Sequence, residues 1–242
     1  MAIIHKKQFF RGLLLLASFA IMLVIILLPL IPDQDGRRMT GLQYADEVFN
    51  ELSKGSSYFI PQAEEAAKGM EGKSVYLVSR LTSGRQAEMA RTILAEAGAP
   101  QLRVEDDKLA FRADLGKILL VATRDSDLMY HNDGKAIEEK YGGANPLEIM
   151  AAWWHLLSPC VRELQKQKRS PEASAVDSVI RRAVEPGNNF YGIPAEKVSG
   201  NILLLCALLL FYILYTIWYG FGIYEVFDGM GLMGAPIKEE ED

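Results

Sequence analysis

The chain has 242 residues, half of them hydrophobic, and a formal net charge of −5 at pH 7. That length fits one domain of ordinary size together with membrane segments. The mild negative charge and the lack of a basic stripe argue against a nucleic-acid partner. With three histidines and two cysteines, we expect no haem or structural zinc site within the chain, and we predict no cofactor.

Two uncharged apolar blocks lie near the ends of the chain. The first runs from Gly12 to Ile31, and the second is uncharged from Val198 to Tyr224. Twenty helical residues span about 30 Å, the thickness of the hydrocarbon core of a bilayer. The sequence therefore predicts two transmembrane helices, over residues 12–32 and 198–224, with the lipid bilayer as a partner. A cleaved signal peptide is the alternative for the first block, which is longer than the usual apolar region of about 7–15 residues.

Basic residues near the membrane ends predict the orientation. Lys6, Lys7 and Arg11 form a compact group within the short basic N-terminus, residues 1–11, and Lys238 follows the second block. The opposite side carries three basic residues close to the blocks. Because Lys and Arg concentrate on the cytoplasmic side, we expect both termini in the cytoplasm and the middle domain outside it. The predicted location is the cell (inner, cytoplasmic) membrane.

Residues 33–197 are predicted to form a mixed α+β soluble domain, a small sheet with a hairpin followed by a mostly helical part. We expect Thr40 to cap a helix that runs through Leu52 and is stopped by Gly55, and a short helix from Pro61. The sheet combines a strand over 75–78 with a hairpin over 102–105 and 108–112, which follows a helix ended by Gly98. In this hairpin the inward side chains are predicted to be Leu102, Val104, Leu109 and Phe111.

The second half of this domain is predicted to be helical. Asp114 caps a helix that runs to about residue 129, although 118–122 could instead be a fourth strand. Asn145-Pro146-Leu147-Glu148 begins a long helix. Ser170-Pro171 begins another, which Glu185-Pro186-Gly187 is expected to end. On the long helix, Trp153 and Trp154 could stack on a ligand, but we favour packing in the core or against the membrane.

The sequence contains no P-loop, no GxGxxG after a strand, and no HExxH, CxxC or GxSxG motif. One polar cluster stands out, consisting of Asp125, Asp127, His131, Asn132 and Asp133. Such groups could bind a metal ion or perform acid–base chemistry. A helix end followed by an Asx-rich turn explains the same residues, and we favour it.

The second apolar block has a polar and aromatic seam with alternating steps of four and three residues. Its members are Asn201, Leu205, Leu208, Tyr212, Tyr215 and Tyr219. Polar and tyrosine side chains in lipid hydrogen-bond between helices, so the seam predicts a packing face for another transmembrane helix. That helix could be the first span of the same chain or a partner. The tyrosines could also be ordinary aromatic-belt anchors.

The C-terminal tail, residues 225–242, is glycine-rich and then acidic. Residues 220–234 are apolar and aromatic but contain five glycines and two acids. We expect Phe221, Tyr224 and Phe227 to dock in the membrane interface or on a neighbouring subunit. About twenty residues after the second span are too few for an output domain, which argues against a complete histidine kinase or chemoreceptor.

These features favour a non-catalytic accessory or assembly subunit of a larger membrane complex. Its partners would be membrane-protein subunits or a second copy of the chain. The first alternative is a ligand-sensing module that signals through a partner. The second is a membrane-anchored enzyme that uses the Asp125–Asp133 cluster.

Overall fold

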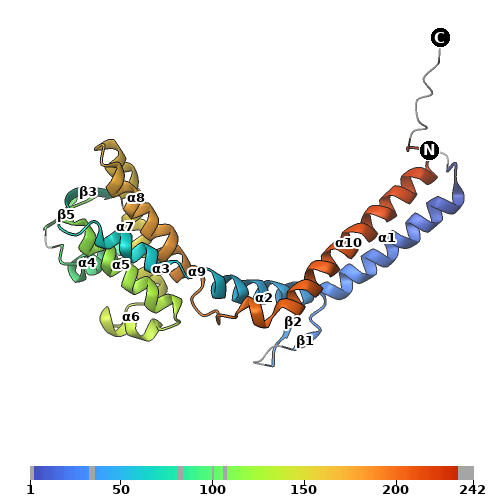
Figure 1. Cartoon of the computed structure of the whole chain (residues 1–242), viewed down its shortest axis with the longest axis horizontal. Helices are drawn as coiled ribbons and strands as arrows, with labels where there is room; N and C mark the ends of the chain where they lie inside the picture. The colour runs from blue at the N-terminus through green and yellow to red at the C-terminus, as the bar shows by residue number, and fades with distance from the viewer. Residues whose placement is uncertain (1–2, 33–35, 81–83, 100, 106–107, 234–242) are drawn as a thin grey trace, which may run out of the picture. The chain divides into compact units, whose positions relative to one another are not determined.

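The computed structural model describes residues 3–32, 36–80, 84–99, 101–105 and 108–233. The chain is mostly helical and divides into two units (Figure 1). Unit 1 combines residues 1–52 with residues 196–242, and unit 2 consists of residues 53–195.

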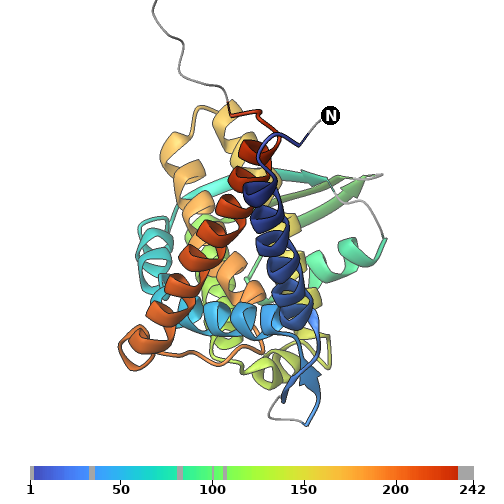
Figure 2. The same cartoon turned by 90° about the vertical axis from the view of Figure 1, so that its right-hand side faces the viewer.

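Unit 1 contains the two longest helices, α1 (Lys6–Leu27) and α10 (Ile202–Gly229), which lie side by side and antiparallel (Figures 1 and 2). Both are long and apolar enough to cross a membrane. Helix α1 begins before the apolar block and ends at Leu27, because Pro29 disfavours helical backbone in the residue before it. Helix α10 does not end at Tyr224 as predicted but continues to Gly229, which places the start of the predicted tail within the helix.

The rest of unit 1 follows α1. Strand β1 (Ile31–Pro32) pairs with β2 (Arg38–Met39), and α2 (Gly41–Ser56) comes next. Thr40 caps α2 as predicted: its Oγ1 accepts from the N–H of Gln43 at 3.1 Å, while Gln43 Oε1 accepts from the Thr40 N–H at 2.8 Å. Helix α2 runs past Gly55 to Ser56, so the predicted stop at this glycine is wrong. Hydrogen bonds from Lys54 in the last turn to distant residues stabilise the helix there. A 3₁₀ turn (Val198–Gly200) precedes α10.

Unit 2 contains a three-stranded antiparallel sheet in the order β3-β5-β4: β3 (Ser74–Arg80), β5 (Lys108–Asp114) and β4 (Gln101–Glu105). The β4–β5 hairpin confirms the predicted one. Leu109 and Phe111 are buried as expected, whereas the side chains of Leu102 and Val104 lie outside the described residues. Leu77 of β3 stands opposite Phe111, so both lie on the face that the helices cover.

The described residues of unit 2 also form seven α-helices: α3 (Ile60–Lys68), α4 (Gly84–Glu96), α5 (Leu115–Tyr130), α6 (Gly134–Lys140), α7 (Pro146–Lys166), α8 (Ser170–Val179) and α9 (Glu185–Asn189). Two predicted caps are present. Asp114 accepts from the Lys117 N–H at 3.3 Å, and Asn145 accepts from the Leu147 N–H at 2.9 Å. Residues 118–122 are helical, which excludes the fourth-strand alternative.

Helix α7 supplies the centre of the core of unit 2. Its buried residues are Pro146, Ile149, Met150, Ala152, Trp153, Leu156, Leu157, Cys160 and Leu164. Trp153 is completely buried, in agreement with the favoured role in packing. The helix lies against β3, where Ser79 Oγ donates to the backbone carbonyl of His155 at 3.2 Å.

The helix that begins at Ser170 does not end at Glu185-Pro186-Gly187, so this predicted stop is wrong. A π-helical turn (Ile180–Val184) joins α8 directly to α9. Pro186 lies just after this π-helical turn, where the register of the helical hydrogen bonds changes. Gly187 serves packing rather than termination, because a Cβ there would lie 2.7 Å from the carbonyl oxygen of Ser126 in α5.

Candidate functional site

The contact between α1 and α10 is built on a seven-residue repeat. Tyr215, Gly222 and Gly229 of α10 all meet α1, at intervals of seven residues. Such a repeat keeps one face of a helix against its partner when the two cross at about 20°. The two apolar helices therefore form a hairpin, which we call the α1–α10 hairpin.

Glycine allows the two backbones of the hairpin to approach closely. A Cβ on Gly12 would lie 2.6 Å from the backbone nitrogen of Val226, and one on Gly229 would lie 2.6 Å from Cα of Phe9. A Cβ on Gly222 would lie 2.8 Å from Leu16 Cδ2. Small residues at a helix–helix contact are the usual means of close approach between membrane helices.

The aromatic part of the predicted seam divides between two faces of α10. Tyr215 stacks on Phe19 of α1 with ring centroids 4.3 Å apart, and the ring of Tyr219 is tilted against the same phenylalanine at 4.9 Å. These two tyrosines therefore contact the chain's own first helix, one of the two partners considered for the seam. Tyr212 is 66% exposed. The remaining seam residues, Asn201, Leu205 and Leu208, are partly shielded.

An ion pair joins the two helices near the end of the hairpin. The Arg11 guanidinium donates to Glu225 Oε1, and Glu225 is only 6% exposed. The second oxygen of this carboxylate is buried without a hydrogen-bond partner among the described residues. Arg11 itself is mostly exposed, so the pair marks the boundary between the apolar stretch and its polar end.

The opposite face of α10 carries a shallow apolar groove, which we call the Gly220 groove. It is lined by Ile217, Gly220, Phe221 and Tyr224 and has a volume of about 340 Å³. A Cβ added at Gly220 would meet no atom of the described residues within 4 Å, so close packing within this part of the chain does not require a glycine there. Phe221 and Tyr224, predicted as docking residues, are exposed beside it, and so is Phe227.

The predicted polar cluster is not a single site, because its members have separate roles. Asp125 is completely buried and accepts from Lys140 Nζ at 2.7 Å, from the Tyr141 hydroxyl at 2.5 Å and from Trp153 Nε1 at 2.8 Å. Burial, together with the Asp125 carboxylate, raises the pKa of Tyr141 above its usual value. This carboxylate organises the core, as a buried charge with full hydrogen bonding does.

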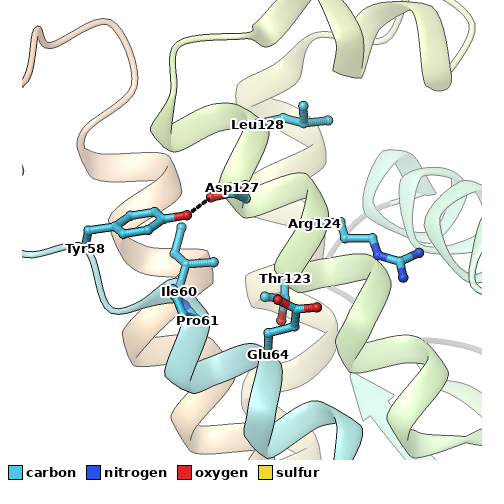
Figure 3. A pocket seen from close by; sticks show the side chains of 8 residues that line it. All are labelled: Tyr58, Ile60, Pro61, Glu64, Thr123, Arg124, Asp127 and Leu128. Atoms are coloured by element: carbon cyan, nitrogen blue, oxygen red, sulfur yellow. Dashed lines mark hydrogen bonds between the residues drawn. The ribbon is translucent and has the colours of Figure 1, made fainter.

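Asp127 lies instead in the lining of a hollow between α3 and α5, with a volume of about 290 Å³ (Figure 3). The Tyr58 hydroxyl donates to Asp127 Oδ1 at 2.8 Å, and His131 Nδ1 lies 3.4 Å from the same oxygen. Burial and the hydrogen bond to Asp127 raise the pKa of Tyr58 to about 12. The tyrosine is therefore a hydrogen-bond donor at neutral pH and not a base.

The last members of the cluster form a turn. Asp133 caps α6 through the Ala136 N–H at 3.2 Å, and Asn132 has a left-handed backbone with φ of 63°. No group of three or more His, Cys, Asp or Glu side chains that could hold a metal ion occurs in the described part of the chain. The geometry agrees with the Asx-rich turn for Asn132 and Asp133.

Asn132 also takes part in a contact that sequence reasoning missed. Lys54, at the end of α2, is 3% exposed, and its Nζ donates to Asn132 Oδ1 at 3.0 Å. The same ammonium donates to the carbonyls of Phe190 at 3.0 Å and Ile193 at 2.5 Å. Burial lowers the pKa of Lys54, and three acceptors compensate its desolvation. Lys54 thereby ties the end of α2 to the loop after α9.

Comparisons with protein-family models, with curated proteins and with solved structures find no match to this chain. Its function is therefore argued from its own residues.

Some of these features had a signal in the sequence and others did not. Gly222 and Gly229 are seven residues apart, which is the spacing of a helix–helix contact and could have indicated their role. Nothing near Gly12 or Lys54 in the sequence distinguishes them, because their partners lie far away along the chain.

Proposed function

We propose that this protein is a non-catalytic accessory or assembly subunit of a larger membrane complex. The α1–α10 hairpin anchors it in the bilayer and binds a transmembrane helix of a partner subunit. Both chain ends lie in the cytoplasm and residues 53–195 lie outside it.

The surface of the hairpin supports insertion in a bilayer. In the most hydrophobic 18-residue windows of α1 and α10, only 6% and 0% of the residues are buried within the protein, so much of their apolar surface is left uncovered by the chain. In water such a surface is adhesive, whereas hydrocarbon chains accommodate it without cost. Placing Arg11 and Glu225 at the polar edge of the bilayer also avoids the cost of charge at its centre.

The Gly220 groove is the observation that carries the proposal of a partner. Tyr215 and Gly222 already meet α1, and about 100° of rotation per residue turns Gly220 and Tyr224 to the far side of α10. A glycine between Ile217 and Phe221 provides the close approach and the apolar walls that a second helix needs. Contact with lipid chains alone does not require a groove of this kind, because flexible acyl chains adapt to the helix surface.

Site-specific crosslinking tests this proposal. A photoreactive p-benzoylphenylalanine is placed at Phe221 in the full-length chain, which is illuminated in the native membrane and extracted in mild detergent. We expect a covalent adduct with a discrete membrane protein that also copurifies at a fixed ratio. The same probe at Leu203, which is 85% exposed on α10 outside the groove, is the control and should give lipid adducts only.

A pair of variants distinguishes the groove from the rest of the helix surface. Gly220→Leu fills the groove and should abolish the adduct and the copurification. Ala207→Leu adds the same bulk at another exposed position of α10 and should leave both intact. A crosslinked homodimer, a clean monomer, or equal behaviour of the two variants would contradict the proposal.

A further inference from the structure

A second hollow in unit 2 lies between α7 and the segment that follows α8. Its volume is about 360 Å³, within the range of about 300–1,000 Å³ for small-molecule sites. The residues that line it are Met150, Ala151, Trp154, His155, Val184, Glu185, Asn188 and Asn189. We call it the Trp154 hollow.

Trp154 provides an accessible aromatic wall. Its neighbour Trp153 is completely buried, whereas Trp154 is 41% exposed, and the His155 ring stands edge-on to it with centroids 5.2 Å apart. The indole Nε1 donates to Glu185 Oε1 at 3.3 Å, which fixes the ring beside the polar wall. An indole held in this way offers a flat apolar surface at little entropic cost.

The opposite wall is polar and is oriented by the π-helical turn. Glu185, Asn188 and Asn189 lie on one side of α9, immediately after residues Ile180–Val184. A π-turn inserts one residue, which rotates everything after it by about 100° relative to a continuous α-helix. Without this turn, a different set of α9 side chains would face Trp154.

We propose that the Trp154 hollow binds a sugar ring. One C–H face of the ring stacks on the indole, and its hydroxyl groups hydrogen-bond to the carboxylate of Glu185 and the carboxamides of Asn188 and Asn189. Carboxylates and carboxamides can each bond two neighbouring hydroxyls, and a sugar ring presents both an apolar face and such hydroxyls.

The position of Glu185 favours a neutral ligand over an organic cation. A cation could also lie on an indole beside a carboxylate. Glu185, however, accepts from the indole Nε1 of Trp154 at 3.3 Å. Because this N–H lies in the plane of the ring, the carboxylate stands at the edge of the indole and not over its face, where it can bond hydroxyl groups at the rim of a stacked ring.

Ligand-detected NMR on the full-length protein tests the proposal. The chain is placed in lipid nanodiscs, because detergents with sugar headgroups would compete for the site. Saturation transfer is measured to maltose, to N-acetylglucosamine and to choline, which is the cationic probe. We expect transfer to the ring C–H protons of at least one saccharide, with a Kd of about 1 mM or tighter, and none to choline.

Variants assign the signal to the hollow. Trp154→Ala should weaken saccharide binding about tenfold or more, as expected for the loss of one stacked ring. Asn189→Ala changes an exposed side chain and should weaken binding while leaving the thermal unfolding curve unchanged, so a folding defect cannot explain the loss. Tyr76→Ala removes an exposed aromatic ring on β3 and should have no effect. Absence of transfer to both saccharides, binding of choline alone, or unchanged binding in both Trp154→Ala and Asn189→Ala would overturn the proposal.

Discussion

Replacing Asp125 by alanine tests whether the carboxylate in the core serves stability. Asp125 is completely buried and accepts hydrogen bonds from Lys140, Tyr141 and Trp153. Alanine removes the shared acceptor of all three donors. The Tyr141 hydroxyl and the Trp153 indole N–H are buried, so neither regains a partner in water without local opening.

The expected cost follows from these two donors. An unsatisfied buried donor costs about 1–3 kcal/mol, so Tyr141 and Trp153 together cost about 2–6 kcal/mol. Lys140 contributes less, because a quarter of its side chain is exposed and its Nζ lies 3.8 Å from Glu96. The sum agrees with the range of about 3–5 kcal/mol for breaking a buried ion pair. A loss of this size should lower the Tm of unit 2 by about 10 °C.

Thermal unfolding of the full-length chain in detergent, followed by near-ultraviolet circular dichroism, measures this cost. Asp127→Ala is the matched control on the same helix. Its carboxylate is partly exposed and accepts mainly from Tyr58, so the loss should stay below about 1 kcal/mol. If Asp125→Ala unfolded within about 2 °C of the parent, or if both variants lost equal stability, the reasoning would be refuted.

Three further predictions concern other parts of the chain. Gly12→Leu should separate the helices of the hairpin, because a Cβ there meets the backbone of Val226; a spin-label distance between α1 and α10 should increase. Burial and the charges of Glu196 and Glu47 raise the pKa of Glu51 above its ordinary value of 4.5. The ionised carboxylate therefore lowers the free energy of unfolding, an effect that is absent below pH 4.5 and develops as the pH rises through the folded-state pKa. Glu51→Gln should therefore raise the Tm at pH 7 but not at pH 4. Burial raises the pKa of the Cys160 thiol to about 12, so in a Cys206→Ser background a maleimide at pH 8 should label only unfolded protein.

The hairpin of the sheet and the helix caps were predictable because they depend on neighbouring residues. Asp114 and Asn145 cap the helices they precede, and Leu109 and Phe111 stand two residues apart between Lys108 and Arg112, so both face the same side of the strand. The predicted stops at Gly55 and Gly187 failed for the opposite reason. Lys54, in the last turn of α2, is bound by Asn132, which lies far away along the chain. Gly187 packs closely against Ser126 of α5.

In the candidate sites, too, features set by neighbouring residues were predictable and features set by distant contacts were not. Asp125 and Asp127 are two residues apart on α5, and helical geometry turns them to different sides. This spacing alone argues against a single site that contains both carboxylates. It does not indicate that Tyr58 contacts Asp127 or that Trp153 contacts Asp125. The Trp154 hollow depends on a π-helical turn, for which the sequence offers no established pattern.

By itself, the sequence determined two helices long and apolar enough to cross a membrane, the hairpin of the sheet and the beginnings of most helices. These properties follow from composition and from spacing over a few residues, which determine local backbone preference and which faces avoid water. Only the tertiary structure decided that Tyr215 and Tyr219 meet Phe19, that Gly220 is left open on the other side of α10, and that Asp125 and Asp127 have different partners. Each of these contacts joins residues far apart along the chain, and their geometry depends on the packing of whole helices against one another.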